Sequence, residues 1–221
     1  ALFTGVDASR EETLGIANDC AAAGVNDIVA LRGDAPKGSD GFAAHPDGFA
    51  SSVDLIGALA ETGKFNIRVG AYPEAHPEAK SQAADIDWLK AKLDAGATEA
   101  LTQFFFEADT FLRFRDKCAA AGITAPIVPG ILPIENWKGA RKFASSCNTS
   151  IPAWLDDAFD KAERDDRSDL LATAICTELC SDLMDEGVDA LHFYTLNRPE
   201  LTRDVCFALG VTPKVDLQNV A

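Results

Sequence analysis

Five times along this chain, a helix-like stretch ends at a glycine and an apolar run follows. The glycines are Gly24, Gly63, Gly96, Gly122 and Gly187. Glycine is the usual residue just after a helix, because it enters the left-handed conformation without a side-chain clash. The repeat of helix, glycine, strand and polar loop predicts a parallel α/β fold, either a barrel or a doubly wound sheet.

Six apolar runs are the predicted strands, and most are nearly continuous, as expected of parallel strands covered on both faces. They are Leu2–Val6, Asp27–Arg32, Asn66–Tyr72, Ala100–Phe105, Pro126–Ile131 and Ala190–Thr195. The predicted helices are Glu11–Ala23, Ser51–Thr62, Ala79–Ala95, Ala108–Ala121, Ile134–Ser145 and Arg167–Glu186, with a short helical pattern at Asp204–Leu209. The mixed-charge stretch Asp156–Asp169 is expected to be a solvated connection.

The placement of polar residues favours the barrel. No GxGxxG motif follows any strand, which weakens the dinucleotide-binding open-sheet alternative. Polar groups follow nearly every strand, and a barrel uses all its strand ends in this way. We therefore expect a (β/α)₈ TIM barrel in which residues 1–221 form a single catalytic domain with six of the eight βα units. The chain opens directly on a strand, so the two N-terminal units are expected to be absent.

Composition excludes several classes of partner. The chain has 221 residues and a net charge of −15, which argues against nucleic acid or anionic membrane as a partner. Local basic residues can still bind a phosphate, so a nucleotide cofactor stays open. The N-terminus lacks the pattern of a signal peptide, and we expect a cytoplasmic protein. Six cysteines without a CxxC pair predict reduced thiols, and no metal site is expected.

Two short motifs concentrate the candidate functional side chains. Leu31-Arg32-Gly33-Asp34 follows one predicted strand, and Tyr72-Pro73-Glu74-Ala75-His76-Pro77-Glu78 follows the next. Polar groups at the carboxyl ends of successive parallel strands are where α/β enzymes place their chemistry. The two motifs therefore predict a cofactor site.

These motifs resemble the methylenetetrahydrofolate reductase family. The matching segments are Ala30–Asp34, Ala71–Glu78, Thr102–Phe106, Pro126–Pro133 and His192–Arg198, in order and over nearly the whole chain. The resemblance implies an eight-stranded barrel, of which this chain corresponds to units three to eight. The family's catalytic Glu, its general acid, and a Thr belong to the first two units and have no counterpart here.

The resemblance also implies an activity. It is the reduction of 5,10-methylenetetrahydrofolate to 5-methyltetrahydrofolate, with FAD as cofactor and NADH or NADPH as co-substrate, feeding methionine synthesis. Relatives assemble, so a homo-oligomer is expected. The alternative is a non-catalytic folate- or flavin-binding module that a partner subunit completes.

The family's functional residues map onto positions of this chain. The resemblance implies catalytic roles for Asp34, beside the flavin ring, and Gln103, which meets the pterin. The implied cofactor contacts are Arg32, Gly33, Asp34, Ala50, Tyr72, His76, Ala79, Asp85, Trp88 and Lys92. The implied substrate contacts are Gln103, Phe143 and Arg198. Taken alone, most of these residues would more often be structural, and Phe143 is as readily a helix core residue.

Three positions depart from the family pattern. Leu2 stands where a family member uses His against the flavin, and Trp88 and Ala91 stand where Asn and Arg help to hold the nucleotide. The resemblance therefore implies that this chain grips the adenosine end of FAD differently.

Overall fold

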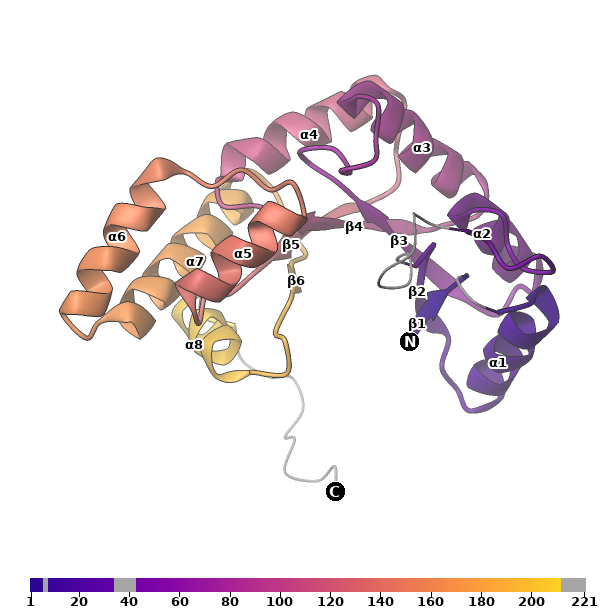
Figure 1. The fold of residues 1–221 in the computed structure, drawn as a ribbon, viewed down its shortest axis with the longest axis horizontal. Coiled ribbons are helices and arrows are strands. Elements are labelled where there is room, and N and C mark those ends of the chain that lie inside the picture. Colours follow the sequence, from indigo (N-terminus) through magenta and orange to yellow (C-terminus); the bar gives the residue numbers. More distant parts are fainter. Residues whose placement is uncertain (6–7, 34–42, 212–221) are drawn as a thin grey trace. The chain divides into compact units, whose positions relative to one another are not determined.

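The computed structural model describes residues 1–5, 8–33 and 43–211, which have an α/β fold (Figure 1). The elements are β1 (Leu2–Thr4), α1 (Arg10–Ala22), β2 (Asp27–Leu31), α2 (Ser52–Glu61), β3 (Asn66–Ala71), α3 (Gln82–Asp94), β4 (Glu99–Phe104), α4 (Ala108–Ala120), β5 (Ile127–Ile131), α5 (Trp137–Ser146), α6 (Ala153–Arg164), α7 (Ser168–Asp185), β6 (His192–Phe193) and α8 (Glu200–Ala208). The strands follow chain order across one sheet, and the pairs β1–β2, β2–β3, β3–β4 and β5–β6 are parallel. The predicted parallel α/β fold is confirmed.

The prediction that a left-handed glycine follows each of five helices is also confirmed. All five glycines have positive φ, from +65° at Gly63 to +116° at Gly96. Gly96 is required for a second reason, because a Cβ there would lie 2.5 Å from the Cβ of Ala60. This glycine lets the start of the next βα unit approach α2 closely.

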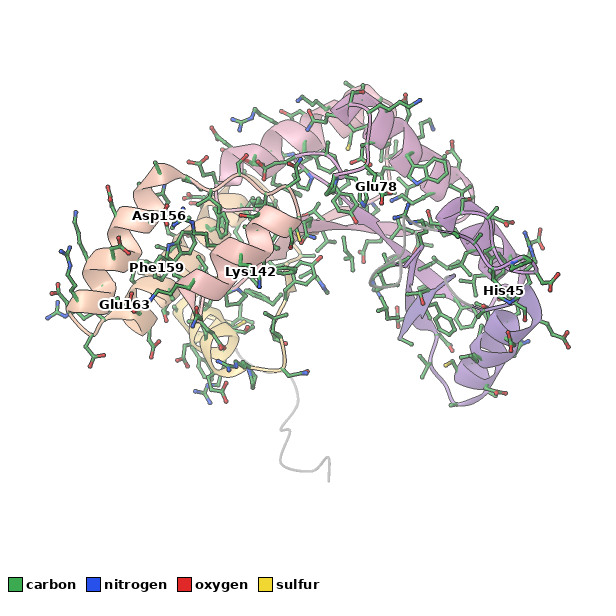
Figure 2. All side chains as sticks on the ribbon, viewed as in Figure 1. His45, Glu78, Lys142, Asp156, Phe159 and Glu163 are labelled. Carbon is green, nitrogen blue, oxygen red and sulfur yellow. The ribbon has the colours of Figure 1, made fainter. Side chains whose placement is uncertain are left out.

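One predicted connection is wrong. Most of the stretch Asp156–Asp169 belongs to α6, along which Figure 2 labels Asp156, Phe159 and Glu163. The helix buries Leu155, Phe159 and Ala162 on one face. That spacing is the amphipathic pattern of a helix, and the surrounding acidic residues concealed it.

The chain packs as two compact units. The first comprises Ala1–Thr102 and Arg115–Val128, and the second comprises Gln103–Phe114 and Pro129–Ala221. The boundary passes through β4 and β5, so it divides strands rather than linkers. A single catalytic domain over the whole chain stays a prediction.

In the first unit, α2 packs against β2 and β3, and α3 packs against β3 and α2. Residues alternate along β3: Ile67, Val69 and Ala71 are buried, whereas Arg68 and Gly70 are half-buried. The expectation of strands covered on both faces therefore holds for β4 and β5, in which consecutive residues are buried, but for only one face of β3. The other face of β3 carries Arg68, which forms ion pairs with the neighbouring strands, and Gly70, which lines a pocket.

In the second unit, α7 packs against both α6 and α8. The same unit contains two stacked pairs of aromatic rings. Phe105 stacks on Phe111 with centroids 5.6 Å apart, and Trp137 of α5 stacks on Phe159 of α6 at 5.1 Å. Trp137 also donates from its indole nitrogen to Asp156 Oδ1 at 2.9 Å. The stack of Trp137 on Phe159 and this bond fix α5 against α6.

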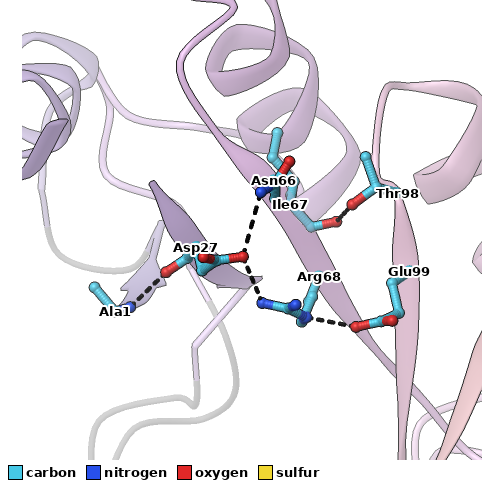
Figure 3. Close-up of polar contacts among 7 residues, drawn as sticks. All are labelled: Ala1, Asp27, Asn66, Ile67, Arg68, Thr98 and Glu99. Atoms are coloured by element: carbon cyan, nitrogen blue, oxygen red, sulfur yellow. Dashed lines mark hydrogen bonds and ion pairs between the residues drawn. The ribbon is translucent and has the colours of Figure 1, made fainter. Parts of the chain in front are cut away.

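Charged groups join the amino ends of three strands in the first unit (Figure 3). Arg68 of β3 donates from Nη1 to Asp27 Oδ1 of β2 at 3.0 Å, and from Nε to Glu99 Oε2 of β4 at 2.5 Å. Asn66 Nδ2 donates to the same Asp27 oxygen at 3.3 Å. These contacts raise the pKa of the Arg68 guanidinium, chiefly through its bond to Glu99. One cation therefore holds two carboxylates that would otherwise repel.

We expect Arg68→Met to lower the free energy of unfolding by about 1–2 kcal/mol, because both carboxylates lose their cation. Urea unfolding followed by circular dichroism measures the change. Arg113→Met is the matched control, since Arg113 pairs with Asp109 across one turn of α4 in an exposed ion pair. The control should cost less than about 0.5 kcal/mol. Equal losses in the two variants would contradict a special role for Arg68.

Candidate functional site

The first unit contains a pocket of about 600 Å³. Its walls come from β1, β2 and β3 with the residues that follow β2 and β3, the start of α2, and one face of α3. The volume is within the range of roughly 300–1,000 Å³ typical of small-molecule sites. The pocket lies at the carboxyl ends of parallel strands, as the sequence predicts for the functional site.

The pocket gathers the residues expected to contact the cofactor. Nine of the ten line it: Arg32, Gly33, Ala50, Tyr72, His76, Ala79, Asp85, Trp88 and Lys92. The tenth, Asp34, lies outside the described residues. The structure thus brings these side chains to one place, while their contact with a cofactor stays a prediction.

Hydrogen bonds tie the segment after β3 to α3. The backbone N–H of His76 donates to Asp85 Oδ2 at 2.9 Å, and Gln82 Nε2 donates to the carbonyl of Pro73 at 2.6 Å. The His76 ring meets the Tyr72 ring edge-on, with centroids 4.7 Å apart. Asp85 therefore positions this wall of the pocket through the backbone.

Arg32 is held by a carboxylate that the sequence analysis did not single out. Glu78 (Figure 2) accepts two bonds from the guanidinium, at 2.6 Å from Nη1 and 3.1 Å from Nη2. The Arg32 guanidinium lowers the pKa of Glu78 below its usual value. Both residues line the pocket. The only signal in the sequence was the position of Glu78, two residues after His76 within the second motif.

Lys92 is a nearly buried cation at the pocket wall. Its side chain is in the last turn of α3, the residue is 7% exposed, and its ammonium donates to the backbone carbonyl of Gly70. Burial lowers the pKa of Lys92 to about 8, and the nearby charge of Asp85 partly opposes that shift. A buried ammonium is costly without an anionic partner. The pocket is therefore suited to an anionic ligand such as a phosphate.

Gly70 has no side chain, so it leaves the backbone of β3 uncovered at the pocket wall, next to the Lys92 ammonium. A Cβ built there would lie 3.5 Å from Leu31 Cδ2 and 4.0 Å from the Tyr72 hydroxyl, and all three residues line the pocket. A side chain at position 70 would therefore enter the pocket. Absence of that side chain suits a flat ring lying close to the strands.

The three expected substrate residues belong to the second unit. Gln103 Oε1 accepts from the N–H of Phe104 at 3.0 Å. Phe143 is 37% exposed, and its ring lies 5.1 Å from that of Phe104. Arg198 Nη1 donates to Glu135 Oε2 at 2.9 Å. Phe143 is thus partly packed and partly exposed, so the contact with Phe104 leaves both of its interpretations open.

Leu196 and Asn197, just before Arg198, have φ values of +49° and +62°. Consecutive left-handed residues other than glycine are uncommon and are found more often at functional sites than elsewhere.

In residues 1–5, 8–33 and 43–211, no group of three or more His, Cys, Asp or Glu side chains could hold a metal ion. No helix in those ranges is long and apolar enough to cross a membrane. All six cysteines are free thiols.

A family model for methylenetetrahydrofolate reductase matches residues 1–210. The chain belongs to this family. It is 47% identical to the 5,10-methylenetetrahydrofolate reductase of Pectobacterium carotovorum over 214 residues, and 48% identical to that of Escherichia coli K12 over 212. Each match covers 96% of this chain and 70% of the relative. This methylenetetrahydrofolate reductase family member is accordingly a folate-reducing oxidoreductase, in agreement with the resemblance.

A solved structure supports the fold alone. It is an uncharacterized protein from Clostridium thermocellum that binds two copies of 5-methyl-5,6,7,8-tetrahydrofolic acid. The TM-score is 0.51 at 13% sequence identity, covering 94% of this chain and 92% of that one.

We expect Lys92→Met to stabilise the ligand-free chain at neutral pH by about 1–3 kcal/mol, because it removes a buried charge. The Lys92 pKa is about 8 when folded and 10.5 when exposed, so the folded chain binds fewer protons between these values. Wild-type stability should therefore rise across that window, and the advantage of the variant should shrink.

Urea unfolding without added ligand, at neutral pH and near about pH 10, measures this difference. Lys90→Met is the matched control, because Lys90 is an exposed neighbour on α3 paired with Asp94. It should change stability by less than about 0.5 kcal/mol at either pH. A destabilised Lys92→Met variant at neutral pH would contradict the expectation.

Proposed function

We propose that this chain binds FAD in the pocket of its first unit and uses it to reduce 5,10-methylenetetrahydrofolate to 5-methyltetrahydrofolate with NADH or NADPH. The observation that carries the proposal is the pairing of a nearly buried ammonium, Lys92, with bare backbone at Gly70 in one pocket. A phosphate and a flat ring are the two parts of a flavin nucleotide. The flavin supplies the hydride-transfer chemistry when it is bound.

The pocket residues have distinct tasks in this proposal. Lys92 neutralises a phosphate, and the planar fork of Arg32, held by Glu78, meets ligand oxygens. The Tyr72 and His76 rings form a wall beside the isoalloxazine and the ribose-phosphate part. Asp85 acts as a positioning residue, because it fixes the backbone of His76. Gly33, Ala50 and Ala79 allow close approach of the ligand to the backbone.

The remaining expected residues complete the proposal. Asp34 is proposed to lie beside the flavin ring, where its carboxylate disfavours negative charge on the reduced flavin. Gln103 is proposed to hydrogen-bond the pterin, Phe143 to stack on it, and Arg198 to hold the glutamyl carboxylate. A charge-assisted bond of that kind is worth roughly 1.5–3 kcal/mol.

We further propose that the six strands are six of the eight strands of a (β/α)₈ barrel. Parallel strands in chain order, each adjacent pair joined through helices, support this architecture. A cytoplasmic location, which the free cysteines favour, and a homo-oligomeric assembly, which the family resemblance implies, are part of the same proposal.

The first test is the visible absorption spectrum of the purified chain with added FAD, followed by NADH or NADPH without oxygen. A flavin spectrum that bleaches supports both the cofactor and the first half-reaction. A bound flavin that neither nicotinamide bleaches would favour the alternative, a binding module without turnover. Failure to take up FAD would overturn the proposed cofactor.

The pocket itself is tested by Gly70→Leu. We expect FAD to bind at least about tenfold more weakly, because the new side chain enters the space of the ring. Gly15→Leu on α1 is the matched control, since a Cβ there meets nothing within 4 Å and the residue does not line the pocket. Equal FAD affinity in the two variants would place the cofactor elsewhere.

A further inference from the structure

The second unit contains a largely buried carboxylate that the proposed function does not use. Glu135 follows β5, and its side chain is 26% exposed, whereas the side chain of Arg198, after β6, is 69% exposed. Nη1 of Arg198 donates to Oε2 of Glu135 at 2.9 Å. A carboxylate with little access to water depends on such a partner, because burial disfavours its charge. The bond therefore ties the exposed guanidinium to a fixed point on the unit.

The pairing of two strands brings these residues to one place. β5 and β6 are parallel, with Ile131 opposite Phe193, and the N–H of Tyr194 donates to the Ile131 carbonyl at 2.8 Å. Residues that follow parallel strands emerge at the same edge of the sheet. Glu135 and Arg198 therefore belong to the edge at which the substrate contacts are expected.

The turn before Arg198 has an unfavourable backbone conformation. Leu196 and Asn197 are both left-handed, and the N–H of Arg198 donates to the Thr195 carbonyl at 2.8 Å. Consecutive left-handed residues other than glycine persist only where surrounding contacts hold them. The Leu196 side chain is 66% exposed and adds little packing. The bond between Arg198 and Glu135 is thus one of the contacts that hold this turn.

The guanidinium keeps a second edge for a ligand. Arginine presents five N–H donors in a planar fork, and Glu135 takes its bond at Nη1. Nε and Nη2 form another edge, whose two parallel N–H groups match the two oxygens of a carboxylate. Glu135 therefore occupies one part of the fork and leaves an edge that suits a second carboxylate.

Glu135 has two opposite effects on an incoming carboxylate. Its charge repels the carboxylate, but water and salt weaken that repulsion around an exposed group such as Arg198. Its bond restricts the Arg198 side chain, which otherwise loses its freedom only when the ligand binds. An arginine side chain has much freedom to lose, so we expect the second effect to exceed the first.

We propose that Glu135 is a positioning residue, which holds Arg198 by one nitrogen so that the other edge of the guanidinium receives the glutamyl carboxylate of the folate. It thereby makes the site selective for folates with a free glutamyl carboxylate. The inference rests on the proposed function, in which Arg198 holds that carboxylate.

The test compares the binding of two ligands by isothermal titration calorimetry. They are 5-methyltetrahydrofolate and its diamide, in which both glutamyl carboxylates are neutral. Glu135→Met keeps the length of the side chain but removes the acceptor, so 5-methyltetrahydrofolate should bind about tenfold more weakly. The affinity for the diamide should stay within about twofold. Glu135→Gln keeps an acceptor oxygen and should recover most of the lost affinity.

Glu163→Met is the matched control, since Glu163 (Figure 2) pairs with Lys138 at 3.3 Å in another ion pair of the second unit. It should leave both affinities unchanged. Relaxation of the ¹⁵Nε–H group of Arg198 without ligand gives a second readout. That group should be ordered in the wild type, Glu135→Gln and Glu163→Met, and mobile in Glu135→Met. Circular dichroism confirms that each variant is folded.

The outcomes separate the two proposals. If the wild type binds 5-methyltetrahydrofolate but Glu135→Met binds it equally or more tightly, the positioning role is overturned and the proposed function stands. An equal loss of affinity for the diamide also overturns the positioning role. If 5-methyltetrahydrofolate binds in a Glu135-dependent way but no flavin binds, the positioning role stands and the flavin function fails. If the wild type binds neither folate, both fail.

Discussion

The candidate site depends on the parallel pairing of β1, β2 and β3. Thr4 pairs with Leu31, Ala30 pairs with Val69, and the N–H of Gly5 donates to the Leu31 carbonyl at 3.2 Å. Because the strands share one direction, the residues that follow them emerge at one edge of the sheet. Residues widely separated in sequence, such as Arg32 and Tyr72, meet in the pocket for this reason.

The same direction creates a different problem at the amino ends of the strands. Asp27 and Glu99 begin two strands on either side of β3, and Arg68 is the cation between them. Charged side chains thus hold the strands together at their amino ends, through Arg68, and line the pocket at their carboxyl ends, through Lys92. At the pocket, the charge of Lys92 is destabilising, because burial removes water from its ammonium and lowers its pKa. A pocket that contains such a group is less stable than an apolar one of the same shape.

Most helices and strands, and most of the residues that line the pocket, could be predicted from the sequence. Glycine after each helix and apolar strands gave the order of the fold, because local backbone conformation determines both. The helix α6 was missed, because its acidic residues hid the buried positions Leu155 and Phe159. Periodicity could not find the pocket role of Lys92, since a lysine on a helix is usually solvated. The family resemblance supplied that role.

Other features required the folded chain. The bond between Arg32 and Glu78 depends on how the segment after β3 turns back, which no local pattern specifies. The openness of Gly70 depends on the neighbouring Leu31 and Tyr72 side chains. The exposure of Trp88 became clear only once α3 was docked, since a tryptophan among Ile86 and Leu89 is ordinarily expected in the core.

The desolvated ammonium of Lys92 also gives the pocket a preference among ligands of the same shape. A ligand that carries a negative charge restores to the ammonium the favourable interaction that it lost on leaving water. A neutral ligand of the same shape adds no such interaction, and leaves the ammonium with the Gly70 carbonyl and the nearby charge of Asp85. If the pocket is the proposed flavin site, a flavin without a phosphate would gain little there, and the burial of Lys92 that weakens the fold would also discriminate against it.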